Sequence, residues 1–384
     1  MENREWIEGK LLDIANIKMG QSPKGETCNN SNGLPLLNGP TEFGLKHPKE
    51  MQYTTDSRKE CVPLDILFCV RGSTTGRMNW ADKVYSIGRG LAAINHKSGA
   101  DYNYFIKGLL DYNLDLLLAS ATGSTFPNIS RSQLETLEIQ LPPLPEQKAI
   151  ASVLSSLDDK IDLLHQQNQT LEALAETLFR QWFIEEAKED WEDCTIGDLA
   201  IHSKISVHPK KNPDILYYHY SIPAFDSNKK PVVEFGKEIQ SNKYKVEENS
   251  ILFSKLNPHK DKRVWLIQDS VEEHAICSTE LQVVKPKDND YLYFIYGWLT
   301  NSIYYNEIAA GVGGTSGSHQ RIEPKAIFSA PCVKIDKNII HQYNILAEPL
   351  FKKQFENQQQ IQTLTKLRDT LLPKLMSGEV RVKN

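Results

Sequence analysis

The chain has 384 residues, which favours two or three domains, and its 40% hydrophobic, 24% charged and 9% aromatic content excludes a disordered protein. No window approaches the roughly 20 apolar residues of a membrane span, MENREWIEGK is not a signal peptide, and the six cysteines form no CxxC pair. We therefore expect a cytoplasmic protein without a membrane partner, a disulfide framework or a metal site. The net charge of -5 would disfavour a nucleic-acid partner if it were spread evenly along the chain. Residues 172–193, however, hold eight acidic residues against two basic ones, and the rest of the chain has a net charge of +1.

The first predicted globular domain covers residues 1–143. A short apolar strand is expected at Ile66–Val70, followed by a basic loop, Arg71–Arg77, that is broken by glycines. Apolar residues at helical spacing follow over Tyr102–Ala119, then the Gly/Ser/Thr loop ATGSTFPNIS and a closing strand in LETLEIQL.

A long amphipathic helix is predicted over residues 144–186. Pro145 suits a first helical turn, and apolar residues then recur every seven positions, with Asn168 as one polar residue in the seam. At about 1.5 Å per residue the helix is roughly 58 Å long, too long to bury itself against one small domain. It therefore needs a partner helix.

The second predicted domain, residues 187–336, repeats the first at a shift that grows from 185 to 193 residues. Ile251–Phe253 corresponds to Ile66–Phe68, and residues 291–299 match residues 102–110 at six of nine positions. A Gly/Ser/Thr loop, AAGVGGTSGSHQ, and a closing segment, IFSAPCVKI, follow as in the first copy. The growing shift indicates short loop insertions in the second copy.

A second long helix with its tail is predicted over residues 337–384. We expect it to pair antiparallel with the first as a coiled coil; the alternative is two separate helices, each packed on its own domain. The fold class is thus α+β, with two similar globular α/β domains joined by two long helices in a pseudo-two-fold repeat. The residues expected on the partner-helix face are Leu144, Gln147, Ile150, Leu157, Ile161, Leu164, Leu171, Leu178, Leu364, Leu371 and Leu375.

The chain lacks the common catalytic motifs. It has no P-loop, no strand-borne GxGxxG, no HExxH and no GxSxG. Leu141–Leu144 has two prolines but lacks the polar and aromatic flanks of an amino-methyltransferase motif, and Glu323–Lys325 lacks the upstream carboxylate of a metal-dependent nuclease. We expect no catalytic residue in this chain.

The loops of both copies carry side chains suited to DNA. Arginine can bind guanine bidentately, asparagine can bind adenine, and lysines and hydroxyls can contact phosphates. For any one of these residues, a plain solvated turn is an equally good interpretation. In the first copy the candidates are Arg71, Ser73, Thr74, Thr75, Arg77, Ser124, Thr125 and Asn128. In the second copy they are Lys255, Asn257, His259, Lys260, Lys262, Arg263, Ser318, His319, Gln320 and Arg321.

The chain resembles the specificity subunit of Type I restriction-modification enzymes over nearly its full length, and two motifs carry this resemblance. LPPLPEQKAI at 141–150 resembles the central conserved helix of that family, and LRDTLLPKLMSGEVRV at 367–382 is similar to its C-terminal signature. The second helix departs from the family pattern at 335–342, where IDKNIIHQ replaces the Pro-x-x-Glu-Gln opening.

The resemblance implies a non-catalytic DNA-recognition subunit. Each globular domain would be a target-recognition domain for one half of an asymmetric bipartite site in double-stranded DNA. The helices would space the domains and dock two modification subunits, which methylate DNA with S-adenosylmethionine, while two restriction subunits would use ATP and Mg²⁺. The alternatives are a methyltransferase or nuclease with an unrecognised site, and a coiled-coil scaffold that does not bind DNA.

Overall fold

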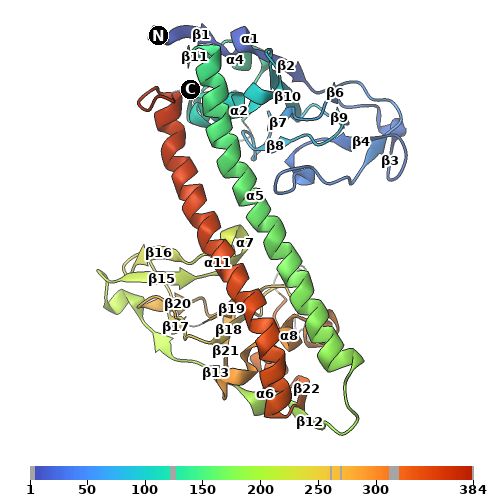
Figure 1. Cartoon of the computed structure of the whole chain (residues 1–384), viewed down its shortest axis with the longest axis vertical. Helices are drawn as coiled ribbons and strands as arrows, with labels where there is room; N and C mark the ends of the chain where they lie inside the picture. The colour runs from blue at the N-terminus through green and yellow to red at the C-terminus, as the bar shows by residue number, and fades with distance from the viewer. Residues whose placement is uncertain (1–4, 122–126, 260–261, 269, 311–319, 383–384) are drawn as a thin grey trace. The chain divides into compact units, whose positions relative to one another are not determined.

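The computed structural model describes residues 5–121, 127–259, 262–268, 270–310 and 320–382, apart from the side chain of Asn228. The chain divides into two compact units, one of Met1–Gln167 with Glu356–Asn384 and one of Asn168–Phe355. The predicted boundaries after residues 143, 186 and 336 lie at helix ends, whereas the compact units divide both long helices (Figure 1).

The strands of the first unit form a pair, a four-stranded sheet and a five-stranded sheet. They are β1 Ile7–Lys10, β2 Ala15–Met19, β3 Cys28–Asn29, β4 Leu34–Leu37, β5 Tyr53–Thr54, β6 Glu60–Cys61, β7 Ile66–Cys69, β8 Met78–Trp80, β9 Tyr85–Ile87, β10 Leu91–His96 and β11 Glu138–Leu141. The orders are β1-β11, β2-β10-β7-β8 and β3-β5-β4-β9-β6.

The second unit repeats this arrangement. Its strands are β12 Glu192–Thr195, β13 Ala200–Ser203, β14 Ser206–Val207, β15 Leu216–Tyr220, β16 Val232–Phe235, β17 Lys243–Lys245, β18 Ser250–Ser254, β19 Val264–Ile267, β20 Ala275–Cys277, β21 Leu281–Pro286 and β22 Pro331–Lys334. The orders are β12-β22, β13-β21-β18-β19 and β14-β17-β20-β15-β16. In each five-stranded sheet one central pair is parallel, β4 with β9 and β15 with β20. The fifth strand lies at opposite edges in the two copies, because β3 extends the first sheet beyond β5, on the β4 side, whereas β14 extends the second sheet beyond β17, on the β20 side.

Strands β7 and β18, which match each other in the two copies, are each buried on both faces. In β7, Ile66 and Phe68 belong to the core that also contains helix residues, while Leu67 and Cys69 belong to the core shared with the five-stranded sheet. In the second unit, Ile251 of β18 and its neighbour Leu252 are divided between two cores in the same way. Burial on both faces explains why these strands have continuous apolar sequences rather than alternating ones.

Short helices repeat between the copies, and one predicted helix in each is broken. The helices are α1 Leu11–Ile14, α2 Asn103–Tyr112, α3 Leu114–Ser120 and α4 Arg131–Glu135, then α6 Ile196–Leu199, α7 Ile222–Asn228, α8 Leu292–Thr300, α9 Ser302–Ala310 and α10 Pro324–Phe328. The continuous helices expected over 102–119 and 291–309 are interrupted at Asn113 and Asn301. Each asparagine side chain hydrogen-bonds a nearby backbone group, Leu109 O for Asn113 and the Ile303 N–H for Asn301, as this residue type does at helix ends.

The two long helices are α5, Leu144–Arg180, which continues as a π-helical turn over Gln181–Glu185, and α11, Lys337–Met376. In the first unit Asp158 of α5 contacts Arg368 of α11, and Glu146 contacts Arg381 of the tail beyond it. From the first contact to the second, the residue number rises along one segment and falls along the other. The halves in this unit are therefore antiparallel.

The halves in the second unit are antiparallel as well. The Asn168 side chain donates to Gln354 O at 3.5 Å, and Phe183 contacts Tyr343 edge to face. The alternative of separate helices that never pack together is therefore wrong. The atypical opening of α11 is capped by Asp336, whose Oδ1 accepts a hydrogen bond from the Asn338 N–H at 2.8 Å.

No helix in the described part of the chain is long and apolar enough to cross a membrane.

Candidate nucleic-acid interface

In the first unit, the loop that follows β7 pairs along its main chain with the segment that precedes α4. The Ile129 N–H donates to Val70 O at 2.9 Å, and the Gly72 N–H donates to Pro127 O at 3.2 Å. Between these two bonds, Arg71 and Asn128 face each other in an isolated antiparallel bridge. The structure therefore brings together two loops that are more than 50 residues apart and that were predicted as separate candidates.

Side chains reinforce this pairing. The exposed Arg71 donates from Nε to Asn128 Oδ1 at 3.0 Å. The Thr75 hydroxyl lies 2.8 Å from Gly72 O and 2.9 Å from Pro127 O, so it holds the loop together instead of pointing to solvent. Ser73 and Arg77 are exposed. Thr74 is half-buried beside the Cys69 thiol.

The second unit builds the same bridge with other side chains. The Ile322 N–H donates to Lys255 O and the Asn257 N–H to Gln320 O, both at 2.9 Å, with Leu256 opposite Arg321 between them. Asn257 has φ +49°, as Gly72 has φ +94° at the matching position of the first copy. Asparagine tolerates this left-handed conformation, and the buried Asn257 Oδ1 has no hydrogen-bond partner among the described residues. Asn257 therefore has a backbone role in addition to its predicted role in reading adenine.

Acidic side chains bind the basic groups of this second loop pair. Glu280 binds Arg321 bidentately at 3.0 and 3.2 Å and lies 3.9 Å from the Lys255 ammonium group. Asp226 of α7 binds Arg263 bidentately at 2.6 and 2.9 Å. Such pairs fix the guanidinium plane and offset its charge.

Lys262 donates to Thr300 O at 2.7 Å, at the C-terminal end of α8. A cation suits a helix C-terminus, so this lysine stabilises α8.

The remaining candidates could be placed only in part. His259 is exposed and Gln320 is half-buried. Five predicted DNA contacts lie outside the described residues: Ser124, Thr125, Lys260, Ser318 and His319.

Three residues near the second loop pair were not predicted: Glu280, Asp226 and His202. Glu280 and Asp226 are 41 and 37 residues from the arginines they bind, in no motif that links them. His202 stacks on Phe328, and burial, together with the charges of Lys204 and Lys255, lowers its pKa to about 4. His202 is therefore neutral at pH 7 and adds no charge beside the loop.

Residues 3–173 match a family described as the Type I restriction modification DNA specificity domain. The Type I restriction enzyme MjaIX specificity subunit of Methanocaldococcus jannaschii is 28% identical over 427 residues, which cover 99% of this chain and 94% of that relative. The first copy of the repeat therefore matches the specificity-domain family, and the whole chain is similar to a Type I specificity subunit.

Other comparisons agree with this assignment. A chain of the same organism that is assigned as the MjaX specificity subunit is 37% identical over 172 residues, 44% of this chain and 40% of that relative. In fold, the chain resembles the crystal structure of a Type-I restriction-modification system S subunit from M. genitalium. The TM-score is 0.63 at 18% identity, over 98% of this chain and 97% of that one.

In this chain, most residues predicted for the partner-helix face are buried or half-buried. Ile150, Leu164 and Leu375 are at most 2% exposed. The half-buried members are Leu157, Ile161, Leu171, Leu178, Leu364 and Leu371. Leu144, in contrast, is 45% exposed.

Gln147, which was predicted on the partner-helix face, hydrogen-bonds to the first globular domain. Its Oε1 accepts from His96 Nε2 at 3.0 Å and its Nε2 donates to Pro142 O at 2.8 Å. The Ser98 N–H donates to His96 Nδ1, and burial lowers the pKa of His96 more than Gln147 raises it. His96 is therefore a neutral donor to Gln147.

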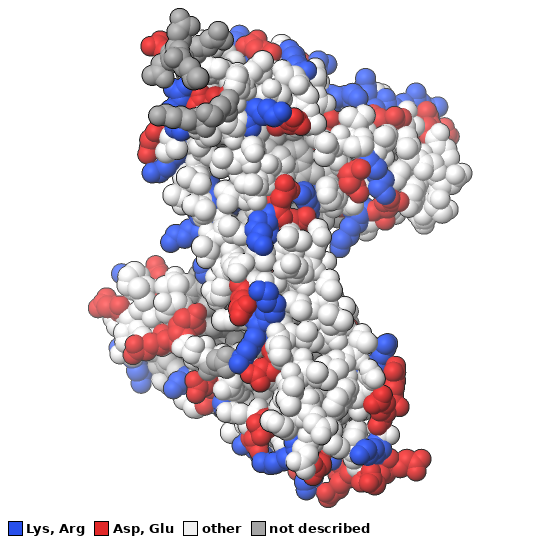
Figure 2. Space-filling model, viewed as in Figure 1, with Lys and Arg blue, Asp and Glu red and all other residues white. Residues whose placement is uncertain are grey.

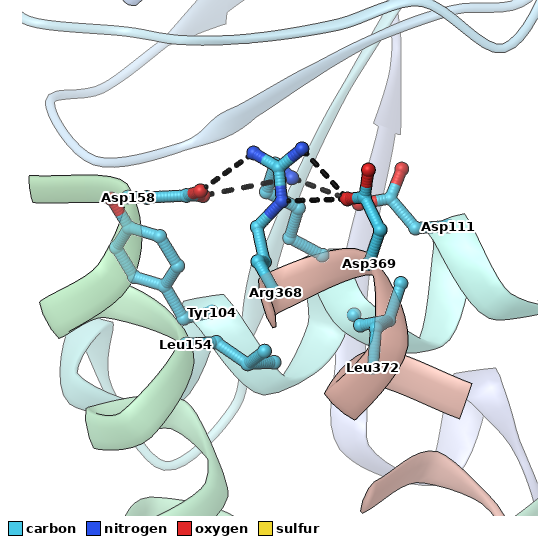
Figure 3. A pocket seen from close by; sticks show the side chains of 9 residues that line it. Tyr104, Asp111, Leu154, Asp158, Arg368, Asp369 and Leu372 are labelled. Carbon is cyan, nitrogen blue, oxygen red and sulfur yellow. Dashed lines mark hydrogen bonds and ion pairs between the residues drawn. The ribbon is translucent and has the colours of Figure 1, made fainter. Parts of the chain in front are cut away.

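A hollow of about 350 Å³ lies in the first unit where α2 meets α5 and α11 (Figure 3). In it, Arg368 donates to Asp158 at 2.9 Å and to Asp369 at 2.8 Å, while Lys107 binds Asp111 at 2.8 Å. Burial alone would lower the pKa of Arg368, but Asp158 and Asp369 outweigh it and raise this pKa. Because the charges satisfy one another, we assign this hollow to helix packing and not to a ligand.

Proposed function

We propose that this chain is a specificity subunit and provides the DNA-sequence recognition of a Type I restriction-modification complex. The loop pair of each unit would contact one half of an asymmetric bipartite site in double-stranded DNA. The observation that carries the proposal is the repeated main-chain bridge, Val70–Gly72 with Pro127–Ile129 and Lys255–Asn257 with Gln320–Ile322, which presents different side chains in the two copies. A shared frame with unlike side chains suits two domains that read unlike sequences.

The charge of the chain is compatible with this role. On the face drawn in Figure 2, basic and acidic side chains are intermixed in each unit. DNA contacts would then come from a few placed groups such as Arg71 and Arg77 rather than from one broad basic surface. Binding of this kind depends on the geometry of the loops as well as on their charge.

The chemistry would reside in partner subunits. Two modification subunits would bring S-adenosylmethionine and methylate the DNA, and two restriction subunits would bring ATP and Mg²⁺ for translocation and cleavage. The half-buried seam residues of α5 and α11 are compatible with helices that space the recognition domains and dock the modification subunits. In this proposal the chain itself supplies no catalytic residue.

A methylation map tests the proposal. The chain is co-expressed with its modification subunits, and methylated adenines are located by sequencing. We expect one asymmetric site with two specific halves around a non-specific spacer. A continuous palindrome would contradict recognition by two unlike domains, and methylation or cleavage by the purified chain alone would contradict the non-catalytic role.

A loop variant separates DNA recognition from a scaffold role. Changing Arg71 and Arg77 together to Ala should reduce recognition of one half-site and leave the other half-site intact. A scaffold that does not read DNA would give the wild-type methylation map.

A further inference from the structure

The guanidinium groups of the two loop pairs occupy opposite sides of the same bridge. In the first unit arginine is on the loop after β7, at Arg71, and faces Asn128. In the second unit that position is Leu256, and the arginine lies across the bridge at Arg321. The two copies thus share the same main-chain bridge but place the arginine on opposite strands of it.

The two arginines also differ in which nitrogens are engaged. Arg321 gives Nε and Nη2 to the Glu280 carboxylate, which occupies the side edge of the guanidinium and offsets its charge. Within the described part of the chain, Arg71 donates a side-chain hydrogen bond only from Nε, to the neutral amide oxygen of Asn128. Among the described residues, no carboxylate forms an ion pair with Arg71. Its positive charge therefore remains available to an external acceptor.

The local backbone of the first unit leaves room for such an acceptor. Gly72, beside Arg71, has φ +94°, and a Cβ built there would meet no atom within 4 Å. The pairing of 70–72 with 127–129 and the Thr75 hydroxyl fix the base of the Arg71 side chain. With Nε held by Asn128, the terminal Nη1 and Nη2 form a two-pronged donor of the kind that binds guanine O6 and N7 in the major groove.

We propose that Arg71 reads a guanine in the half-site of the first unit through Nη1 and Nη2, and that Asn128 is the positioning residue that aims it. This inference rests on the proposed function. In the second unit, Arg321 is held by Glu280 and does not read a base in this way. The two half-sites would then differ because one bridge presents an uncompensated guanidinium and the other a guanidinium bound by a carboxylate.

The test uses the complex of the specificity subunit with its modification subunits, and a DNA library randomised at each position of the mapped site. Arg71→Lys keeps the charge but removes the two-pronged donor, so discrimination for one G·C pair should fall by about 10- to 100-fold. Asn128→Asp supplies a carboxylate like that of Glu280 and should weaken discrimination at the same base pair. Arg131→Lys, an exposed arginine paired with Glu135 close to the loop, is the matched control and should leave the site unchanged.

The outcomes separate this inference from the proposed function. An unspecific wild-type map would contradict the proposed function itself. With a specific wild-type map, the inference is overturned if Arg71→Lys keeps full discrimination at every position, or if it slows methylation equally on all sequences, as loss of a phosphate contact would. It is also overturned if the base pair that Asn128→Asp affects lies in the other half-site from that of Arg71→Lys.

Discussion

Gly108 of α2 and Gly297 of α8 are matching residues of the two copies, yet a methyl group would meet different surroundings at each. At Gly108 a Cβ would lie 3.0 Å from the tip of Leu154 and 3.1 Å from the tip of Met376, both flexible side chains. At Gly297 it would lie 2.2 Å from a ring carbon of Phe179, which is packed against Phe183, Phe294 and Trp298. An aromatic ring held on several sides has little freedom to move away.

We expect Gly297→Ala to lower the free energy of unfolding by about 1–3 kcal/mol through overpacking. Gly108→Ala should change it by less, because alanine is favoured over glycine in a helix by about 1 kcal/mol and the flexible tips can shift. Urea unfolding of both variants measures the difference. Equal stability of the two variants would contradict the role given to the Phe179 ring.

At the same scale, the candidate site could be predicted only in part from the sequence. Arg71 and Asn128 were both selected because their residue types suit DNA, and the structure places them in contact. Glu280 and Asp226 were not found, since acids that are far from a basic loop in sequence give no local signal. Asn257 was selected for its amide, whereas its φ of +49° shows a backbone requirement that residue type alone does not reveal.

Among the elements, the repeated strands and long helices were predictable and the five-stranded sheets were not. β7 and β18 contain short continuous apolar runs, and α5 and α11 have apolar residues at helical spacing. The five-stranded sheet of the first unit includes strands of only two residues, such as Cys28–Asn29, which are too short to show a period. The closing strand predicted in LETLEIQL, residues 134–141, is shorter in the structure: a Ser130–Gln133 capping box starts α4, which includes its first two residues, and β11 begins only at Glu138.

Within the first unit, the ion pair between Asp158 and Arg368 joins the two long helices (Figure 3). The Asp158 side chain is 17% exposed and the Arg368 side chain is 30% exposed, so the exposure of this pair lies between that of a surface ion pair and that of a fully buried one. Arg368→Gln should therefore lower the free energy of unfolding by about 1–2 kcal/mol, more than the 0–1 kcal/mol of a surface pair and less than the 3–5 kcal/mol of a buried one.

The matched control for this element is Arg131→Gln, which removes an arginine that is 62% exposed from a single-turn pair with Glu135. Its effect on urea unfolding should stay below about 0.5 kcal/mol. If Arg368→Gln were as mild as Arg131→Gln, the contact between α5 and α11 would contribute no more than a surface pair.

At the scale of the whole molecule, each unit has its own cores, a strand pair, a four-stranded sheet and a five-stranded sheet with one parallel central pair, so the duplication seen in sequence is also a duplication of structure. Each unit also contains buried or half-buried histidines. Burial is the main cause that lowers the pKa of His96 and His165 in the first unit and of His202 and His219 in the second. Both units therefore share a dependence of stability on pH that comes from neutral histidines.

The sign of this dependence follows from linkage. These histidines have a pKa near 6.5 when unfolded and a lower one when folded, so below pH 6.5 the unfolded chain binds more protons than the folded chain. The stability that they contribute is complete above pH 6.5 and is lost as the pH falls toward the folded pKa, which is about 4 for His202. The lowered pKa values of Asp198 and Asp288 change stability only below their ordinary pKa of 3.8, outside this pH window.

Urea unfolding from pH 7.5 to 5 should therefore show a steady loss of stability in the wild type and a smaller loss in His202→Gln, because glutamine cannot take up that proton. Equal losses in the two proteins would mean that His202 is as easily protonated in the folded chain as in the unfolded one, and that Lys204, Lys255 and its burial beside Phe328 do not keep it neutral.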